Sequence, residues 1–512
     1  MELIKKRIHY VREGKKIFDQ FYVDEDYNVP EAKEDVRRIV DTGTELKIEE
    51  IRPVENYVRI TGKLYFRILY LNVSSDPKPG VLEGKLPFEE MVYAENQEGE
   101  EFYVQNVRIE FTPSLIHSRK LSLRAMVELE VGREKLVDEE TVTDAEGDVP
   151  LYKKMKKVQL LQLEVTKKDT YRIKEEITIP GTKESIGQIL FSDISERKLE
   201  LRPGQDELIV RGELFLFCMY LSGDEKPDWI SQTIPYEGRI PCEGISEEMY
   251  FSIRHTMEDT LTDLRMDEDG EMRILGIEGT LALHMNFYRE ESVELLEDLY
   301  SLQKQCLFDT TEVVCEELLM QNQSKCKVTE RLSLPELKTD VLQILHARGA
   351  IQVEHADRTG EGIRVEGILH LSFLYLRGDD AEPYGSWQGM IPFEHQIECK
   401  EMPEETVYNM EQHIEQLQIT LVGSESVEIK GILTFDTFLR RPVKVWTMEN
   451  VREEPLDLEQ LEKRPSIVGH IVQRGEDLWQ LAKQYMTTKE GIMEVNGMQN
   501  ENVKEGDKLL IF

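Results

Sequence analysis

This 512-residue chain lacks the common sequence motifs of enzymes and metal sites. It contains no Walker loop, GxGxxG turn, HExxH helix, GxSxG elbow or EF-hand loop. No pattern therefore predicts bound nucleotide, catalytic zinc, calcium or a nucleophilic serine. The six cysteines include no CxxC pair, which disfavours a zinc site, and they are too few for a disulfide scaffold. We expect no enzyme activity, no metal and no cofactor.

Long apolar runs and positive charge are also scarce. The longest apolar stretches, such as 214–221, have the length of a strand, and a bilayer-spanning helix needs about 20 apolar residues. Residues 1–18 contain no apolar run of signal-peptide length. The formal net charge is −37, from 63 Lys and Arg against 100 Asp and Glu. Such a field repels phosphate backbones and anionic lipids. We expect a cytoplasmic protein without nucleic-acid binding or direct membrane insertion.

The chain does contain a threefold repeat. Segments 58–71, 208–221 and 363–376 each carry a glycine followed eight positions later by a tyrosine: Gly62 and Tyr70, Gly212 and Tyr220, Gly367 and Tyr375. A proline precedes each glycine by 32 residues, at Pro30, Pro180 and Pro335. We predict structural roles for these anchors. The glycines are interpreted as a bulge, a close backbone approach or a site that a neighbouring aromatic covers.

The spacing of apolar residues around each glycine predicts β-strands. In the third segment Ile363, Val365 and Leu369 follow a period of two, which is typical of an antiparallel sheet with one buried and one wet face. A second alternating segment closes each unit, with Ala125, Gly279 and Gly431 at equivalent places. The predicted fold is mainly β, with three tandem β-sandwich or barrel-like repeat domains and a small α+β domain. The expected boundaries are 20–140, 168–290 and 324–440 for the repeats, 441–467 for a linker and 468–512 for the last domain.

Other stretches are interpreted differently. After each repeated proline, apolar residues fall at offsets 6, 9 and 10, as Val36, Ile39 and Val40 do, and this spacing predicts a short helix or a helical turn. Segments 141–167 and 290–323 have the mixed polar composition of connectors. The basic run 153–158 lies in the first of them, and we interpret it as a solvated face.

Residues 470–512 carry the most specific local signals. A strand-like HIVQ precedes Asp477, which forms a capping box with Gln480. A second helix is predicted to start at Thr487 and to stop at Asn496 and Gly497. A short apolar strand ends the chain, so the predicted order is β-α-α-β. The inner face of the first helix consists of Leu478, Leu481, Ala482 and Tyr485.

This pattern closely resembles a LysM domain. The resemblance implies two strands backed by two helices, with a shallow groove that usually receives N-acetylglucosamine polymers. By position, the groove is lined by Gly475, Glu476, Asp477 and Leu478 on one side and by Asn496, Gly497 and Met498 on the other. Trp479 lies off the inner helix face, so we predict a partly exposed aromatic that anchors a protein partner. The alternative is that Trp479 packs on the linker or on a neighbouring repeat.

Three β-rich repeats followed by one LysM domain resemble the clostridial spore coat morphogenetic proteins with SPOCS-type repeats. The resemblance implies a non-enzymatic scaffold in the mother-cell cytoplasm at the forespore surface. Its LysM domain would recruit the coat basement-layer ATPase SpoIVA, and other coat proteins are further expected partners. The alternative function is a peptidoglycan-binding protein of the cell wall or spore cortex, which would need an unusual export route.

Overall fold

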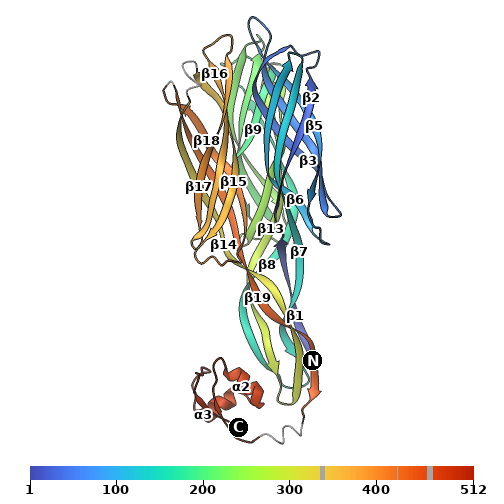
Figure 1. Ribbon diagram of the computed structural model, residues 1–512, viewed down its shortest axis with the longest axis vertical. Helices are drawn as coiled ribbons and strands as arrows, with labels where there is room; N and C mark the ends of the chain where they lie inside the picture. Colours follow the sequence, from blue (N-terminus) through green and yellow to red (C-terminus); the bar gives the residue numbers. More distant parts are fainter. Residues whose placement is uncertain (335–340, 424, 458–464) are drawn as a thin grey trace.

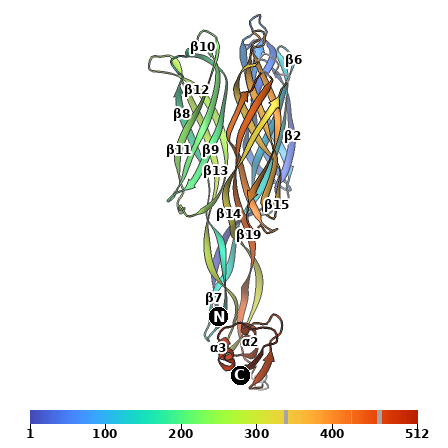
Figure 2. The same cartoon turned by 90° about the vertical axis from the view of Figure 1, so that its left-hand side faces the viewer.

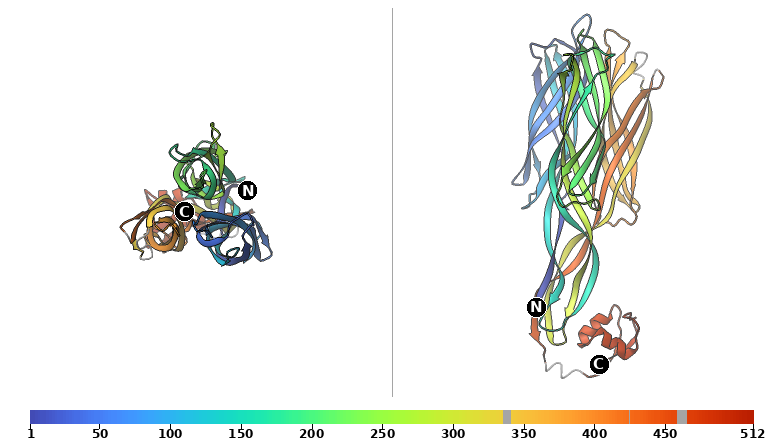
Figure 3. Two further views of the ribbon diagram at one scale, coloured as in Figure 1. Left: turned by 90° about the horizontal axis from the view of Figure 1, so that it is seen from above. Right: turned by 180° about the vertical axis from the view of Figure 1, so that it is seen from behind.

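A computed structural model describes residues 1–334, 341–423, 425–457 and 465–512. Three β-domains stand side by side, a narrow stalk of strands extends below them, and a small helical module lies at the far end of the stalk (Figure 1). A quarter turn shows that the stalk continues strands of all three domains (Figure 2). From above, the domains surround a common axis (Figure 3). The predicted mainly β fold is confirmed.

Each repeat consists of two antiparallel three-stranded arrangements. In repeat 1 these are β3 (Val36–Val54), β4 (Tyr57–Asn72) and β5 (Pro79–Tyr93), and β2 (Ile17–Asn28), β7 (Lys120–Glu146) and β6 (Glu101–His117). In repeat 2 they are β9 (Ile186–Pro203), β10 (Glu207–Ser222) and β11 (Pro227–Pro241), and β8 (Tyr152–Thr178), β13 (Met272–Tyr300) and β12 (Tyr250–Met266). In repeat 3 they are β15 (Val341–Thr359), β16 (Gly362–Arg377) and β17 (Tyr384–Glu398), and β14 (Lys304–Ser333), β19 (Ser426–Pro455) and β18 (Val407–Leu421).

Each repeated glycine lies opposite an aromatic residue of the next strand. The cross-strand pairs are Gly62 with Phe88, Gly212 with Tyr236, and Gly367 with Phe393. A Cβ atom on Gly62 would lie 2.8 Å from the Phe88 ring and 2.2 Å from the carbonyl oxygen of Lys47. A side chain at this position would therefore clash with backbone as well as with the covering ring. The repeated tyrosines are buried in the cores of the three domains: Tyr70, Tyr220 and Tyr375.

The short helices predicted after the repeated prolines are wrong. Val36 opens β3 and Ile186 opens β9, both of which are strands, whereas Pro335 lies outside the described residues. The register of β3 against β4 shifts between Val36 and Arg38, and again between Ile39 and Asp41. Each such bulge adds one residue to the strand. The extra residues break the alternation of apolar positions, and the resulting spacing imitates that of a helix.

The sequence predicts that one face of each glycine strand is exposed to solvent. This prediction is wrong near the C-terminal ends of β4, β10 and β16. There the three repeats pack against one another around the common axis and share an apolar core. Each repeat contributes a residue from its glycine strand and one from the strand before it: Leu69 and Val40, Met219 and Leu190, Leu374 and Leu345. A strand sequence alone does not reveal that its outer face meets a second domain.

A largely buried polar contact also crosses each seam between repeats, and at two of the three seams it is an ion pair. Arg254 of β12 binds Glu134 of β7 at 2.7 Å, Arg348 of β15 binds Asp41 of β3 at 2.7 Å, and His346 of β15 contacts Asp193 of β9 at 2.8 Å. Removing one partner of such a pair leaves an uncompensated buried charge, which is costly. The seams therefore favour one arrangement of the three repeats.

The stalk consists of three two-stranded ribbons. β1 (Glu2–Glu13) pairs with the end of β7, the start of β8 pairs with the end of β13, and the start of β14 pairs with the end of β19. Residues of all three ribbons pack together in shared apolar clusters. The members of the largest cluster include Ile8, Val137, Leu160, Leu295, Val313 and Val445.

The stalk corrects three interpretations of the sequence. The composition of segments 141–167 and 290–323 predicts connectors, but these segments lie mostly in stalk strands. The expected linker 441–467 is strand as far as Pro455, and its residues 458–464 lie outside the described residues. A ribbon strand needs apolar residues on one side only, so its composition resembles that of a polar connector. The same strands run through the predicted repeat boundaries at 140, 290, 324 and 440.

Candidate partner-binding site in the terminal module

The terminal module has the predicted β-α-α-β order. It contains β20 (Val468–Ile471), α2 (Leu478–Tyr485), α3 (Lys489–Asn496) and β21 (Lys508–Ile511), and β20 pairs antiparallel with β21. Each helix is eight residues long. Within the described parts of the chain, no helix is long and apolar enough to cross a membrane.

Local caps fix both helices. Asp477 accepts a hydrogen bond from the backbone N–H of Gln480 at 2.7 Å, and the reciprocal bond completes the predicted capping box. The second helix is capped by Thr488, one residue later than the predicted start at Thr487. Gly497 ends it in the left-handed conformation, with a φ of 63°, as expected of a glycine stop.

One side of the predicted groove is a tightly bonded turn before α2. Gly475 has a φ of +87°, a conformation that side chains disfavour. The carboxylate of Glu476 accepts hydrogen bonds from the backbone N–H of Gln473 and from His470 Nε2, each at 2.7 Å. These two donors lower the pKa of Glu476. Glu476 therefore holds the turn in place.

The other side of the predicted groove is fixed to the last strand. The side chain of Asn496 donates to the carbonyl of Leu510 at 2.7 Å and accepts from its N–H at 2.8 Å. Asn496 thus occupies the edge of β21 as a neighbouring strand would. Beyond Gly497, Met498 packs in the same apolar core as Leu478. One residue from each side of the predicted groove, Leu478 and Met498, therefore packs in the same core.

Trp479 is not the exposed aromatic that the sequence predicts. Its side chain is 6% exposed, and its ring meets that of Tyr300 edge to face, with centroids 5.0 Å apart. The indole Nε1 donates to the carboxylate of Asp298 at 2.7 Å. Both partners lie at the end of β13, at the tip of the stalk. The alternative, packing on a neighbouring element, is what the structure shows.

Further polar contacts join the module to the stalk tip. Lys483 of α2 lies 2.6 Å from Asp298, and the hydroxyl of Tyr300 donates to the carbonyl of Thr487 at 2.9 Å. Lys154 of β8 lies 3.2 Å from the carboxylate of Asp477, on the predicted groove. Sequence reasoning missed these stalk residues. The one available signal was the basic run 153–158, which contains Lys154 and was interpreted as solvated.

The face of the two-stranded sheet that points away from the module core carries exposed apolar side chains. We call it the outward sheet face, and its apolar members are Ile471, Leu510 and Phe512, which are 53%, 42% and 59% exposed. The exposed Lys508 lies on the same face, opposite Ile471. Val495 of α3 adds a further exposed apolar side chain. Contiguous exposed apolar residues often mark interaction sites. The sequence signal was the alternation in the last strand, where Leu509 and Ile511 point inward.

Comparison with protein families matches both parts of the chain. A model described as SipL, SPOCS domain matches residues 35–112, 185–265 and 340–422. A model of the LysM domain matches residues 470–512. Each SPOCS match begins at or next to the strand that follows a repeated proline and ends within or just after the fourth strand from there. No curated protein and no solved structure matches the chain.

Proposed function

Since the chain belongs to the SipL-like spore coat morphogenetic proteins, with three SPOCS domains and a C-terminal LysM domain, we propose that it is a non-enzymatic scaffold of the spore coat. In this proposal it lies in the mother-cell cytoplasm at the forespore surface. Its LysM module recruits the basement-layer ATPase SpoIVA.

The outward sheet face is the observation that carries the proposal. The contacts of Trp479 and Lys483 turn α2 toward the stalk tip, and they leave Leu510 and Phe512 in solvent. The cores of protein interfaces are richer in apolar residues than the remaining surface. The module itself lies at the far end of the stalk, away from the three repeats (Figure 1).

Peptidoglycan binding is the second candidate, and the LysM match supports it. The groove predicted for sugar carries Asp477, which already pairs with Lys154, and Glu476, which already accepts two hydrogen bonds. Sugar hydroxyls would have to compete with these partners. The exposed apolar face has no such competition, which favours the protein partner.

The test compares two ligands on the full-length chain. We expect the protein to bind purified SpoIVA, and the variant Leu510→Asp to bind it at least about tenfold more weakly, because a charge in an apolar interface must be desolvated. Met390→Asp is the matched control, since Met390 is an apolar residue of β17 that is 64% exposed in repeat 3. This control should bind as the unchanged protein does.

The same proteins are then tested with soluble peptidoglycan fragments. Binding to the fragments alone, with no binding to SpoIVA, would reject the scaffold proposal in favour of peptidoglycan binding. Equal loss of SpoIVA binding in Leu510→Asp and Met390→Asp would reject the outward sheet face as the contact.

A further inference from the structure

The three repeats carry three different residue pairs at one equivalent position. Five residues after Ala125, Gly279 and Gly431 stand Glu130, His284 and Asp436. Their partners across the sheet are Gln105, Arg254 and Glu411, respectively. In repeat 1 the amide of Gln105 donates a hydrogen bond to the carboxylate of Glu130. In repeat 2 the guanidinium of Arg254 contacts the imidazole of His284. In repeat 3 two carboxylates face each other.

Like charges directly opposite in a sheet are destabilising. Asp436 is relieved in part, because Gln323 donates to it at 2.8 Å and His413 Nδ1 lies 3.7 Å away. The side chain of Glu411 has neither a hydrogen bond nor an ion pair with any residue in the described part of the chain. Its carboxylate therefore stands without a counterpart.

Two of the cations that act on Glu411 are bound to other carboxylates, and the third, Lys16, acts on it through its charge without a direct contact. The imidazole of His255 lies 3.3 Å from Glu196, and the guanidinium of Arg254 lies 2.7 Å from Glu134. Burial raises the pKa of Glu411, and Asp436 adds to this rise, whereas the charges of His255 and Arg254 oppose it. A cation placed beside Glu411 would compensate both the burial and the repulsion.

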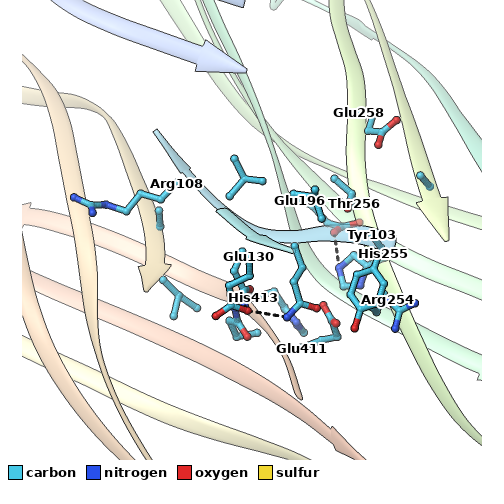
Figure 4. Close-up of a pocket in the computed structure, with 18 of the residues that line it drawn as sticks. Tyr103, Arg108, Glu130, Glu196, Arg254, His255, Thr256, Glu258, Glu411 and His413 are labelled. Carbon is cyan, nitrogen blue, oxygen red and sulfur yellow. Dashed lines mark hydrogen bonds and ion pairs between the residues drawn. The ribbon is translucent and has the colours of Figure 1, made fainter. Parts of the chain in front are cut away.

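A cavity adjoins the two carboxylates. It has a volume of about 280 Å³ and lies between β9 and β12 of repeat 2 and β14, β18 and β19 of repeat 3. Besides Glu411 and Asp436, its lining includes Phe251 and Phe438. Glu411 also lines a larger cavity of about 1560 Å³ between the three repeats. Figure 4 shows Glu411 there, near His255 and His413. The two cavities thus meet at Glu411, which gives a ligand a route of entry.

The donor set points to an organic cation and not to a metal ion. Among the residues that the structure describes, no three His, Cys, Asp or Glu side chains are grouped so that they could hold a metal. Ammonium and guanidinium groups form strong charge-assisted hydrogen bonds with one or two carboxylates. Phenylalanine rings such as Phe251 and Phe438 suit the alkyl part of such a ligand and attract its charge.

We propose that the cavity between repeats 2 and 3 binds an organic cation, whose ammonium or guanidinium group lies between the carboxylates of Glu411 and Asp436. Two sources share this chemistry: a small free amine, or a lysine or arginine side chain of a partner protein. The site is independent of the LysM module.

Titration calorimetry of the full-length chain tests the proposal with three probes. These are 1,5-diaminopentane, agmatine and a lysine-containing tripeptide with blocked ends, and 1-pentanol is the neutral control. We expect saturable binding of at least one cationic probe and none of pentanol. Glu411→Gln should weaken binding at least about tenfold. Glu354→Gln, which removes an exposed carboxylate from the larger cavity, should leave it unchanged.

The stability of the ligand-free protein gives a second readout. Glu411→Gln should raise the melting temperature without ligand, because it removes the repulsion with Asp436, and it should abolish the rise that the cation causes in the unchanged protein. Binding of diaminopentane or agmatine supports a free amine, and binding of the tripeptide alone supports a partner side chain. Failure of all three probes to bind, or equal binding to Glu411→Gln, would overturn the proposal.

Discussion

The seams between the repeats and the seam between the stalk and the LysM module are both closed by charged side chains, but they differ in burial. Arg440 of repeat 3 is 1% exposed. It binds Glu316 of the same repeat at 3.0 Å, and it reaches across the seam to Glu13 of β1 at 3.4 Å. At the module seam the side chain of Lys483 is 36% exposed and that of Asp298 is 23% exposed.

This difference indicates two kinds of attachment. Breaking a buried ion pair by removing one partner costs about 3–5 kcal/mol, whereas an exposed pair contributes about 0–1 kcal/mol. The repeats and stalk should therefore unfold as one unit. The module should be able to leave the stalk tip while that unit stays folded.

The substitution with the largest expected effect is Arg440→Ala. It leaves Glu316 buried without its cation and removes the guanidinium from the rings of Phe438 and Tyr288. We expect a loss of about 3–5 kcal/mol in the free energy of unfolding, measured by urea denaturation with far-UV circular dichroism. Lys444→Ala is the control, because Lys444 pairs with Glu312 in solvent and is 69% exposed.

The control should change the free energy of unfolding far less than Arg440→Ala does, because solvent screens the exposed pair. Similar losses in the two variants would mean that the buried seam is no stronger than a surface pair, and the contrast between the two attachments would disappear.

A buried histidine gives the repeat seam a pH dependence. His284 Nδ1 lies 2.5 Å from Arg254 and 3.2 Å from the carboxylate of Glu134. Because Arg254 can only donate, the shorter contact favours a neutral ring whose Nδ1 accepts. Burial, reinforced by Arg254, lowers the pKa of His284 to about 4. The unfolded chain binds this proton at about pH 6.5. The stabilising contribution of His284 is therefore present above about pH 6.5 and is lost as the pH falls toward about 4.

The measurement compares the unchanged protein with His284→Asn. Between about pH 7 and pH 4 the unchanged protein should lose about 2–3 kcal/mol more in the free energy of unfolding than the variant does. Glu134, whose pKa is raised by burial, titrates in both proteins, so the comparison isolates the histidine. A gain relative to the variant on acidification would contradict the neutral state of His284.

Local signals predicted some parts of this molecule, and long-range contacts decided the others. The capping box at Asp477 and the alternation around Gly367 depend on residues a few positions apart, so a sequence shows them. The stalk depends on ribbons that bury one another, and Glu411 faces Asp436 only once the register of the third repeat is known. The sequence predicts an exposed Trp479 for the same reason: its partner Tyr300 lies far from it in the chain, so no local pattern reveals the contact.

The smallest expected effect concerns this tryptophan at the module seam. Trp479→Phe keeps a ring against Tyr300 and removes the hydrogen bond to Asp298, which should weaken docking of the module by about 1–2 kcal/mol. Hydrogen–deuterium exchange should then become faster in α2 and around Tyr300 while the repeats stay protected. Trp446→Phe on the stalk is the control, since Trp446 is 54% exposed, and it should change neither region. Faster exchange throughout the repeats of Trp479→Phe would instead mean that the module and the body unfold together.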